Sequence, residues 1–159
     1  MNRDYTTGDI VLGNWQLVRQ IGQGSFGTVF EARRAEFGVT YRAAIKIITI
    51  PQSQSEIQSA RVEGMDDMSL TAYFRGIVEE IVQEYILMSK LKGNSHVVSY
   101  EDHAVIHDEN DICWHIVIRM ELLRPLLDYV QSHTLTRKDV IKLGIDICKA
   151  LEVWQKYNI

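Results

Sequence analysis

Three glycines fall within six positions near the start of the chain, at Gly22, Gly24 and Gly27, and a valine follows at Val29. Glycine loses more backbone freedom on folding than any other residue, so a stretch like this needs a compensating reason. One such reason is that a backbone without side chains lets a polyphosphate approach closely. The same spacing opens dinucleotide-binding folds, covers nucleotides in other folds, and also occurs in turns that bind nothing. The flanking sequence therefore has to decide between these alternatives.

The composition argues against several classes of protein. The chain has 159 residues, 46% apolar and 24% charged, which suits one domain with its own core. Its net charge of −4 argues against a nucleic-acid binder, whose surface should be basic. No apolar run is long enough to cross a membrane and the N-terminus has no signal-peptide core, so we expect a cytoplasmic protein. Cys113 and Cys148 lie far apart without metal-site spacing, so we expect free thiols and no metal site.

The residues on both sides of the glycines favour strands. Apolar and polar residues alternate over residues 15–20, which predicts a strand that enters the glycine turn. Thr28, Val29 and Phe30 follow the turn, and β-branched and aromatic residues favour a second strand there. A dinucleotide-binding fold needs a helix directly after its glycines, so we rank an oxidoreductase of that type low. The glycines are therefore expected at the tip of a β-hairpin that lies over a ligand.

A third strand is expected over residues 41–48, and it contains a lysine. Ala44, Lys46 and Ile48 share one face of this strand because side chains alternate between faces. A lysine in so apolar a strand has two explanations. Its stem can snorkel along an exposed edge, or its charge can lie beneath the glycine hairpin and contact phosphate.

The rest of the chain predicts an α+β fold, in which a five-stranded antiparallel sheet packs against one long helix. Residues 52–68 are polar and predict a loop with a short helix at 56–62. Apolar residues recur at helical spacing within 69–92, where they predict one buried stripe: Tyr73, Ile77, Ile81, Tyr85, Met88 and Leu91. Further strands are expected over 96–106 and 114–120, joined by a turn at 108–111. A short helix near 126–130 and a last helix over 137–157, capped by Thr136 and Asp139, complete the prediction.

The order of these motifs resembles the protein kinase superfamily. Gly22-x-Gly24-x-x-Gly27-x-Val29 followed by Ala43-Ala44-Ile45-Lys46 is similar to the first two kinase signatures. Within the superfamily the chain looks most like a bacterial, eukaryotic-like serine/threonine protein kinase. The resemblance implies a kinase N-lobe over residues 1–123, with an insertion at 52–68, and two helices of a partial C-lobe over 124–159.

The resemblance also implies an ATP site. The residues expected to contact ATP are Ile21, Gly22, Gln23, Gly24, Ser25, Phe26, Gly27, Val29, Ala44, Lys46, Met120, Glu121 and Leu123. Lys46 and Glu84 are the expected catalytic residues: Lys46 would hold the α- and β-phosphates and Glu84 would pair with it, with Glu79 and Glu80 as competitors for that role. Met120 would be the gatekeeper before a hinge at 121–123. The acid that holds the ribose has no clear match, and Asp128 is the nearest.

Two motifs of an active kinase do not occur in these residues. His-Arg-Asp, which supplies the catalytic base, and Asp-Phe-Gly, which binds magnesium, are both missing. We therefore expect an ATP-binding fragment that is inactive alone, while Mg²⁺ and a protein substrate belong to the full-length parent. The alternative is a non-catalytic nucleotide-sensing or dimerisation module. The apolar stripe of the last helix, about residues 137–157, predicts self-association.

Overall fold

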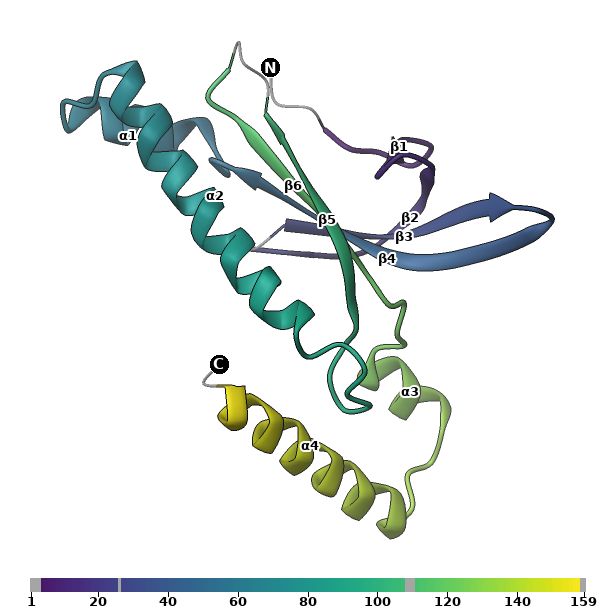
Figure 1. Ribbon diagram of the computed structural model, residues 1–159. Coiled ribbons are helices and arrows are strands. Elements are labelled where there is room, and N and C mark those ends of the chain that lie inside the picture. Colours follow the sequence, from purple (N-terminus) through teal and green to yellow (C-terminus); the bar gives the residue numbers. More distant parts are fainter. Residues whose placement is uncertain (1–3, 26, 108–110, 158–159) are drawn as a thin grey trace.

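A twisted antiparallel sheet with one long helix across its face forms the body of the protein (Figure 1). The structure is a computed structural model that describes residues 4–25, 27–107 and 111–157. Its strands are β1 (Ile10–Val11), β2 (Trp15–Gly24), β3 (Gly27–Glu36), β4 (Val39–Ile50), β5 (Tyr100–His107) and β6 (Trp114–Met120). Its helices are α1 (Gln54–Val62), α2 (Asp67–Ser89), α3 (Leu126–Ser132) and α4 (Arg137–Tyr157).

The predicted α+β class is confirmed, but the prediction of five strands is wrong. The described residues form a six-stranded sheet in the order β1-β2-β3-β4-β6-β5. The additional strand arises because the chain reverses direction after Val11. Leu12 and Gly13 both have positive φ, 47° and 82°, and Val11 then pairs antiparallel with Trp15. Leucine seldom adopts this conformation, so the sequence carries little signal for the turn.

The sheet has an apolar core on each face. On the face that α2 covers, Ile48, Ile116 and Ile118 pack against residues of the helix. On the opposite face, a second cluster is built from Val11, Trp15, Leu17, Phe30, Ala32, Ala43, Ile45, Ile47 and Val117. The central strand β4 contributes to both clusters, since alternate residues of a strand point to opposite faces.

The buried face of α2 differs from the stripe that the sequence predicts. Leu70, Phe74 and Val78 are its buried residues, while Tyr73 is half exposed. The predicted residues Ile77, Ile81 and Tyr85 pack at the margin of the core instead. The helix begins after Asp66, whose side chain accepts a hydrogen bond from the Ser69 backbone N–H at 2.8 Å. None of the helices in the described residues is both long and apolar enough to cross a membrane.

The predicted bounds of α1 agree with the structure better than the predicted start of β5. The short helix predicted within 52–68 is confirmed as α1. Strand β5 begins at Tyr100 rather than at residue 96, because residues 94–99 form a turn and a loop. β5 and β6 pair antiparallel as expected, but residues 108–110 of the predicted turn lie outside the described residues.

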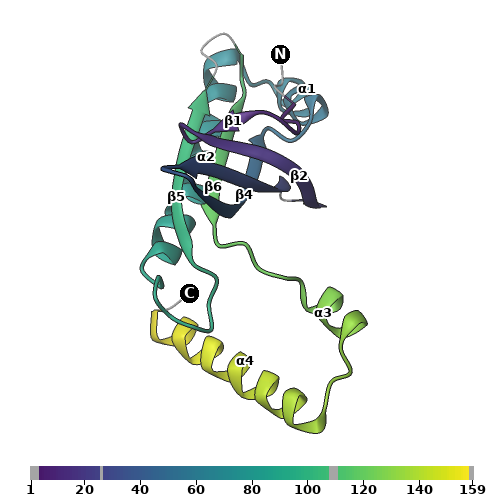
Figure 2. The ribbon, with the colours of Figure 1, turned by 90° about the vertical axis from the view of Figure 1, so that its right-hand side faces the viewer.

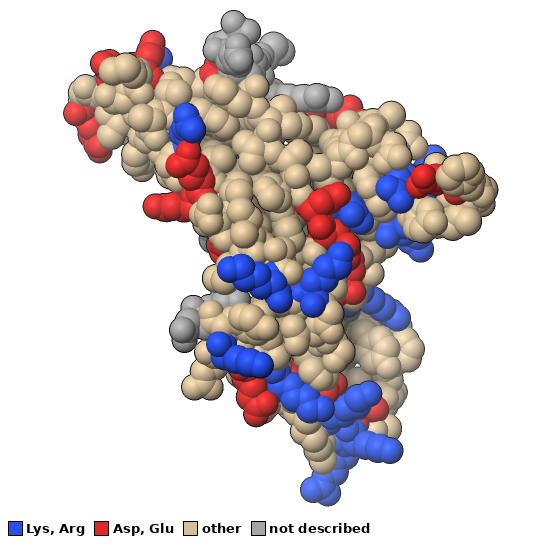
Figure 3. All heavy atoms as spheres, viewed as in Figure 1, with Lys and Arg blue, Asp and Glu red and all other residues tan. Residues whose placement is uncertain are grey.

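Helices α3 and α4 follow the sheet, and α4 lies beyond one end of it (Figure 2). The predicted cap of α4 is confirmed, since Asp139 accepts hydrogen bonds from the backbone N–H and hydroxyl of Thr136 at 2.8 and 2.7 Å. His96 and Asp146 approach within 3.7 Å and connect α4 to the loop before β5. No residue of α4 is buried. Basic side chains gather toward the α4 end on the face in Figure 3.

Gly27 is fixed by close packing between β3 and β4. Its φ is +113°, and a Cβ there would overlap the Ile47 carbonyl oxygen and lie 3.0 Å from the carbonyl carbon. Both groups are backbone atoms of a paired strand and cannot move aside. A Cβ on Gly24 would meet nothing within 4 Å. The packing of the fold therefore requires a glycine at position 27 but not at position 24.

We predict that Gly27→Ala destabilises the fold by about 2–4 kcal/mol, because it adds backbone strain and a clash with β4. Gly24→Ala is the matched control and should change the free energy of unfolding by less than about 0.5 kcal/mol. Urea denaturation followed by circular dichroism measures both. Equal stabilities for the two variants would contradict this account of Gly27.

Candidate functional site

The strand register places the glycine hairpin beside Lys46. Gly22 of β2 is opposite Val29 of β3, and Val29 is opposite Lys46 of β4. Residues opposite one another in an antiparallel sheet share a face. Because neighbouring strands lie about 4.8 Å apart, the Cα atoms of Gly22 and Lys46 are separated by roughly 10 Å. The backbone of the hairpin and the lysine thus border the same stretch of the sheet.

A second row of paired residues lies two positions closer to the end of β6. Ala44 is opposite Glu31 on one side and Met120 on the other, and Met120 is opposite Tyr100 of β5. Ala44 is buried, and Met120 packs against the core cluster beneath α2. The predicted ATP contacts Val29, Ala44 and Met120 therefore share the face of Lys46.

The glycines at the hairpin tip leave its backbone open. A Cβ on Gly22 would touch only Val29, at 3.8 Å, so the packing of the chain requires neither Gly22 nor Gly24. Open backbone at these positions is what close approach of a phosphate needs. Phe26, also predicted to contact ATP, lies outside the described residues.

The residues at the tip line a cleft that does not include Lys46. Gln23, Gly24, Ser25 and Gly27 border a space of about 430 Å³ whose floor includes Phe30 and Ile47. Those two floor residues belong to the core cluster on the opposite face of the sheet. The start of the hairpin is therefore in line with Lys46 on one face of the sheet, while its tip borders the opposite face.

A cleft of about 570 Å³ connects the start of the hairpin with the segment after β6. Ile21 and Leu123, both predicted to contact ATP, line it together. Asp128 of α3 lines the same cleft, which places the nearest candidate for a ribose contact beside them. Ile21 and Leu123 are both exposed, at 36% and 57%, so their apolar surfaces are accessible to a ligand.

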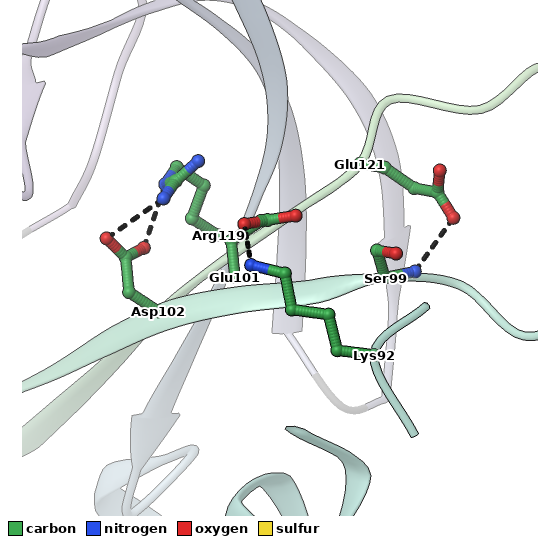
Figure 4. Close-up of polar contacts among 6 residues, drawn as sticks. All are labelled: Lys92, Ser99, Glu101, Asp102, Arg119 and Glu121. Carbon is green, nitrogen blue, oxygen red and sulfur yellow. Dashed lines mark hydrogen bonds and ion pairs between the residues drawn. The ribbon is translucent and has the colours of Figure 1, made fainter. Parts of the chain in front are cut away.

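Glu121, the first residue of the predicted hinge, is hydrogen-bonded to the loop before β5 (Figure 4). Its backbone N–H donates to the Ser99 carbonyl oxygen at 3.0 Å, and its carboxylate accepts from the Ser99 N–H at 2.7 Å. Nearby, Lys92 pairs with Glu101 at 2.6 Å. These contacts fix the point at which the chain leaves β6. The Glu121 carboxylate is occupied by its hydrogen bond with the Ser99 backbone N–H.

The structure does not bring Lys46 and Glu84 together. The Lys46 Nζ donates instead to the Tyr85 hydroxyl at 3.1 Å, and Glu84 is exposed. Among the described residues Glu84 forms no ion pair, and the competing Glu79 pairs with Arg75 at 2.8 Å. Adjacent helix residues point about 100° apart, so only one of Glu84 and Tyr85 can face the sheet.

A charged cluster beside the cleft was missed from the sequence. Glu31 is 6% exposed and accepts hydrogen bonds from the Nε atoms of Arg19 and Arg42 at 2.8 and 2.9 Å. The hydrogen bond from Arg42, followed by that from Arg19, holds the pKa of Glu31 below its ordinary value of 4.5. Both arginines line the same cleft as Ile21 and Leu123. The sequence did contain an indication of this cluster, because an acidic residue within the apolar part of a strand is expected to pair with basic residues on the neighbouring strands.

A comparison with curated proteins finds a similarity that covers part of this chain. A stretch of 69 residues is 28% identical to Serine/threonine-protein kinase ppk30 of Schizosaccharomyces pombe. The match covers 40% of this chain and 7% of the yeast protein, so the chain corresponds to a small part of that relative. No family model matches the chain. The comparison supports a kinase-like relationship of limited extent.

We predict that Glu31→Gln lowers the free energy of unfolding at pH 7 by about 1–2 kcal/mol, because two arginines lose a charged acceptor. The folded-state pKa of Glu31 is lowered, so its stabilisation is fully present above pH 4.5 and is lost as the pH falls through the folded-state value. Urea denaturation at pH 7 and pH 3 should show the difference between wild type and variant shrinking in acid.

The matched control for that experiment is Glu36→Gln on the same strand. Glu36 pairs with Arg34 at 3.2 Å, but its side chain is 46% exposed. Exposed pairs contribute little, so this variant should stay within about 0.5 kcal/mol of wild type at both pH values. A Glu31 variant that behaves in the same way would contradict the assigned role of the cluster.

Proposed function

We propose that this chain is the ATP-binding part of a serine/threonine protein kinase. The observation that carries the proposal is the row formed by Gly22, Val29 and Lys46, which sets open backbone and a cation on one stretch of the sheet. The partial similarity to the fission yeast kinase supports the same class. We propose the division into an N-lobe over 1–123 and a partial C-lobe over 124–159 on the same grounds.

Each part of the site has a physical role in this proposal. The glycine hairpin, residues 22–27, covers the phosphates, and the Lys46 ammonium contacts the α- and β-phosphates. A lysine ammonium has three N–H donors, and one of them is used by Tyr85, so two remain for phosphate oxygens. The adenine lies against the apolar side chains of Ile21, Val29, Ala44 and Leu123, with Met120 behind it. The backbone of 121–123 supplies hydrogen bonds to the adenine edge.

In this proposal the chain binds ATP but does not transfer its phosphate alone. Phosphoryl transfer depends on positioning the nucleophile and the metal ions. The 159 residues contain neither His-Arg-Asp nor Asp-Phe-Gly, which supply those functions in kinases. We assign no Mg²⁺ ligand to this chain, and phosphorylation of protein serine or threonine belongs to the longer parent.

The alternative, a nucleotide-sensing or dimerisation module, is favoured by the surface of α4. Several of its large apolar side chains are between about 40% and 57% exposed, namely Val140, Ile141, Ile145, Ile147, Leu151 and Trp154. Complete burial of such a side chain is worth roughly 1.5–3 kcal/mol, so covering the half that is exposed contributes about 1 kcal/mol each before the costs of association. A second copy of this chain can supply a matching apolar helix.

We predict that Lys46→Ala abolishes the thermal stabilisation that ATP gives to the protein. A ligand at 100 times its Kd stabilises the folded state by about 2.7 kcal/mol, so the shift is measurable by differential scanning fluorimetry. Lys90→Ala, at an exposed lysine after α2, is the control and should keep the full shift. Equal stabilisation of all three proteins would argue against Lys46 as a phosphate ligand.

We also predict that the chain self-associates through α4. Light scattering at rising protein concentration should show a mass above that of the monomer, because association covers apolar surface. Leu151→Glu should reduce the association, while Lys149→Glu, at an exposed polar position of the same helix, should not. A strictly monomeric wild type at high concentration would rule the interface out.

A further inference from the structure

We infer that Tyr85, not Glu84, is the residue that positions Lys46. The Tyr85 hydroxyl accepts a hydrogen bond from the Lys46 Nζ at 3.1 Å, and the ammonium lies 5.9 Å from the centre of the tyrosine ring. The hydrogen bond joins residues 39 positions apart in the sequence and is partly buried. The inference deepens the proposed function, on which its consequence for ATP rests, but the contact itself is independent of any ligand.

Tyr85 is held in place by residues of the sheet. Its ring stacks on Tyr100 with centroids 5.5 Å apart and an interplanar angle of 22°. Tyr100 is buried, and it is opposite Met120 in the register of β5 and β6. Tyr85 itself packs against the core cluster beneath α2. The hydroxyl is therefore presented by a rigid support, which is what a positioning group requires.

The acidic residues on this part of α2 are turned away from the lysine. Glu84 and Glu80 are exposed, and Glu79 is paired with Arg75 on the outer side of the helix. The helix is fixed in this rotation because Leu70, Phe74 and Val78 are its buried residues. Bringing Glu84 to Lys46 would require α2 to turn and to move Tyr85 off Tyr100.

A tyrosine partner has an electrostatic consequence that a glutamate partner lacks. A phenol is uncharged at neutral pH, so Tyr85 fixes the direction of the ammonium without neutralising it. Burial, followed by the charge of Asp102, raises the pKa of the adjacent Tyr100 to about 12, so this ring also brings no negative charge. Lys46 therefore offers its whole charge and two free donors to an anion beneath the glycine hairpin. An anionic phosphate chain is the ligand that this arrangement suits.

The test compares four variants of the 159-residue chain: Tyr85→Phe, Glu84→Gln, Tyr73→Phe and Lys46→Ala. Calorimetric titration with ATP is the first measurement. Tyr85→Phe should weaken binding roughly three- to tenfold, because one hydrogen bond to a charged group is lost while the ring stays. Glu84→Gln and the control Tyr73→Phe, a half-exposed tyrosine of the same helix, should bind as wild type does. Weaker binding by Glu84→Gln with no effect of Tyr85→Phe would overturn the inference.

A second measurement does not depend on ATP. Acetic anhydride labels an amine that the reagent can reach, and the hydrogen bond to the Tyr85 hydroxyl holds the Lys46 Nζ in a partly buried position. In Tyr85→Phe the labelling of Lys46, read by mass spectrometry against the exposed Lys90, should therefore become several-fold faster at an unchanged melting temperature. Unchanged labelling would overturn the inference.

The two measurements separate this inference from the proposed function. If wild type binds no ATP but Tyr85→Phe exposes Lys46 to labelling, the nucleotide proposal fails and the positioning by Tyr85 stands. If wild type binds ATP, Lys46→Ala does not, and Tyr85→Phe matches wild type in both measurements, the function stands and the positioning fails.

Discussion

The register of β4 with its two neighbours determines the arrangement of the whole candidate site. β4 pairs with β3 on one side and with β6 on the other, so Lys46 is in line with Val29 and Ala44 with Met120. A shift of one residue in either pairing would move Lys46 to the opposite face of the sheet. The apolar side chains that alternate along β4 prevent such a shift, because both faces of the strand are buried in a core cluster. Packing that stabilises the fold therefore also holds the lysine on the side of the glycine hairpin.

Local patterns in the sequence predicted much of this arrangement. Alternation over residues 15–20, the glycine spacing and the apolar strand around Lys46 give the hairpin, its neighbouring strand and their order. The start of α4 was also predictable, since Thr136 and Asp139 form a local capping box. The separate strand β1 could not be predicted in this way, because it depends on a leucine with positive φ.

The partner of Lys46 lies beyond what a one-dimensional pattern can provide. Helical spacing identifies α2 as amphipathic, and Tyr85 belongs to the expected apolar stripe. Which of two adjacent residues faces the lysine depends on the rotation of the helix, and this is set by how Leu70, Phe74 and Val78 fit the sheet. Glu31 is a partly similar case: an acid in an apolar strand indicates that basic partners exist, but which arginines they are depends on the pairing of β3 with β2 and β4. To predict a contact between two elements that are distant in the sequence, one must know how the elements pack together as well as that they form.

The close packing of Gly27 against β4 gives the two strands of the glycine hairpin different surroundings. One limb is clamped, because the backbone of β3 at Gly27 lies directly against the carbonyl group of Ile47. The other limb, around Gly22 and Gly24, has open space beside it. The β3 limb is therefore fixed against β4, whereas the β2 limb leaves room beside its backbone for a ligand. Ile21 precedes Gly22 on that limb and lines the cleft with Leu123, so the open part of the hairpin continues directly into the cleft.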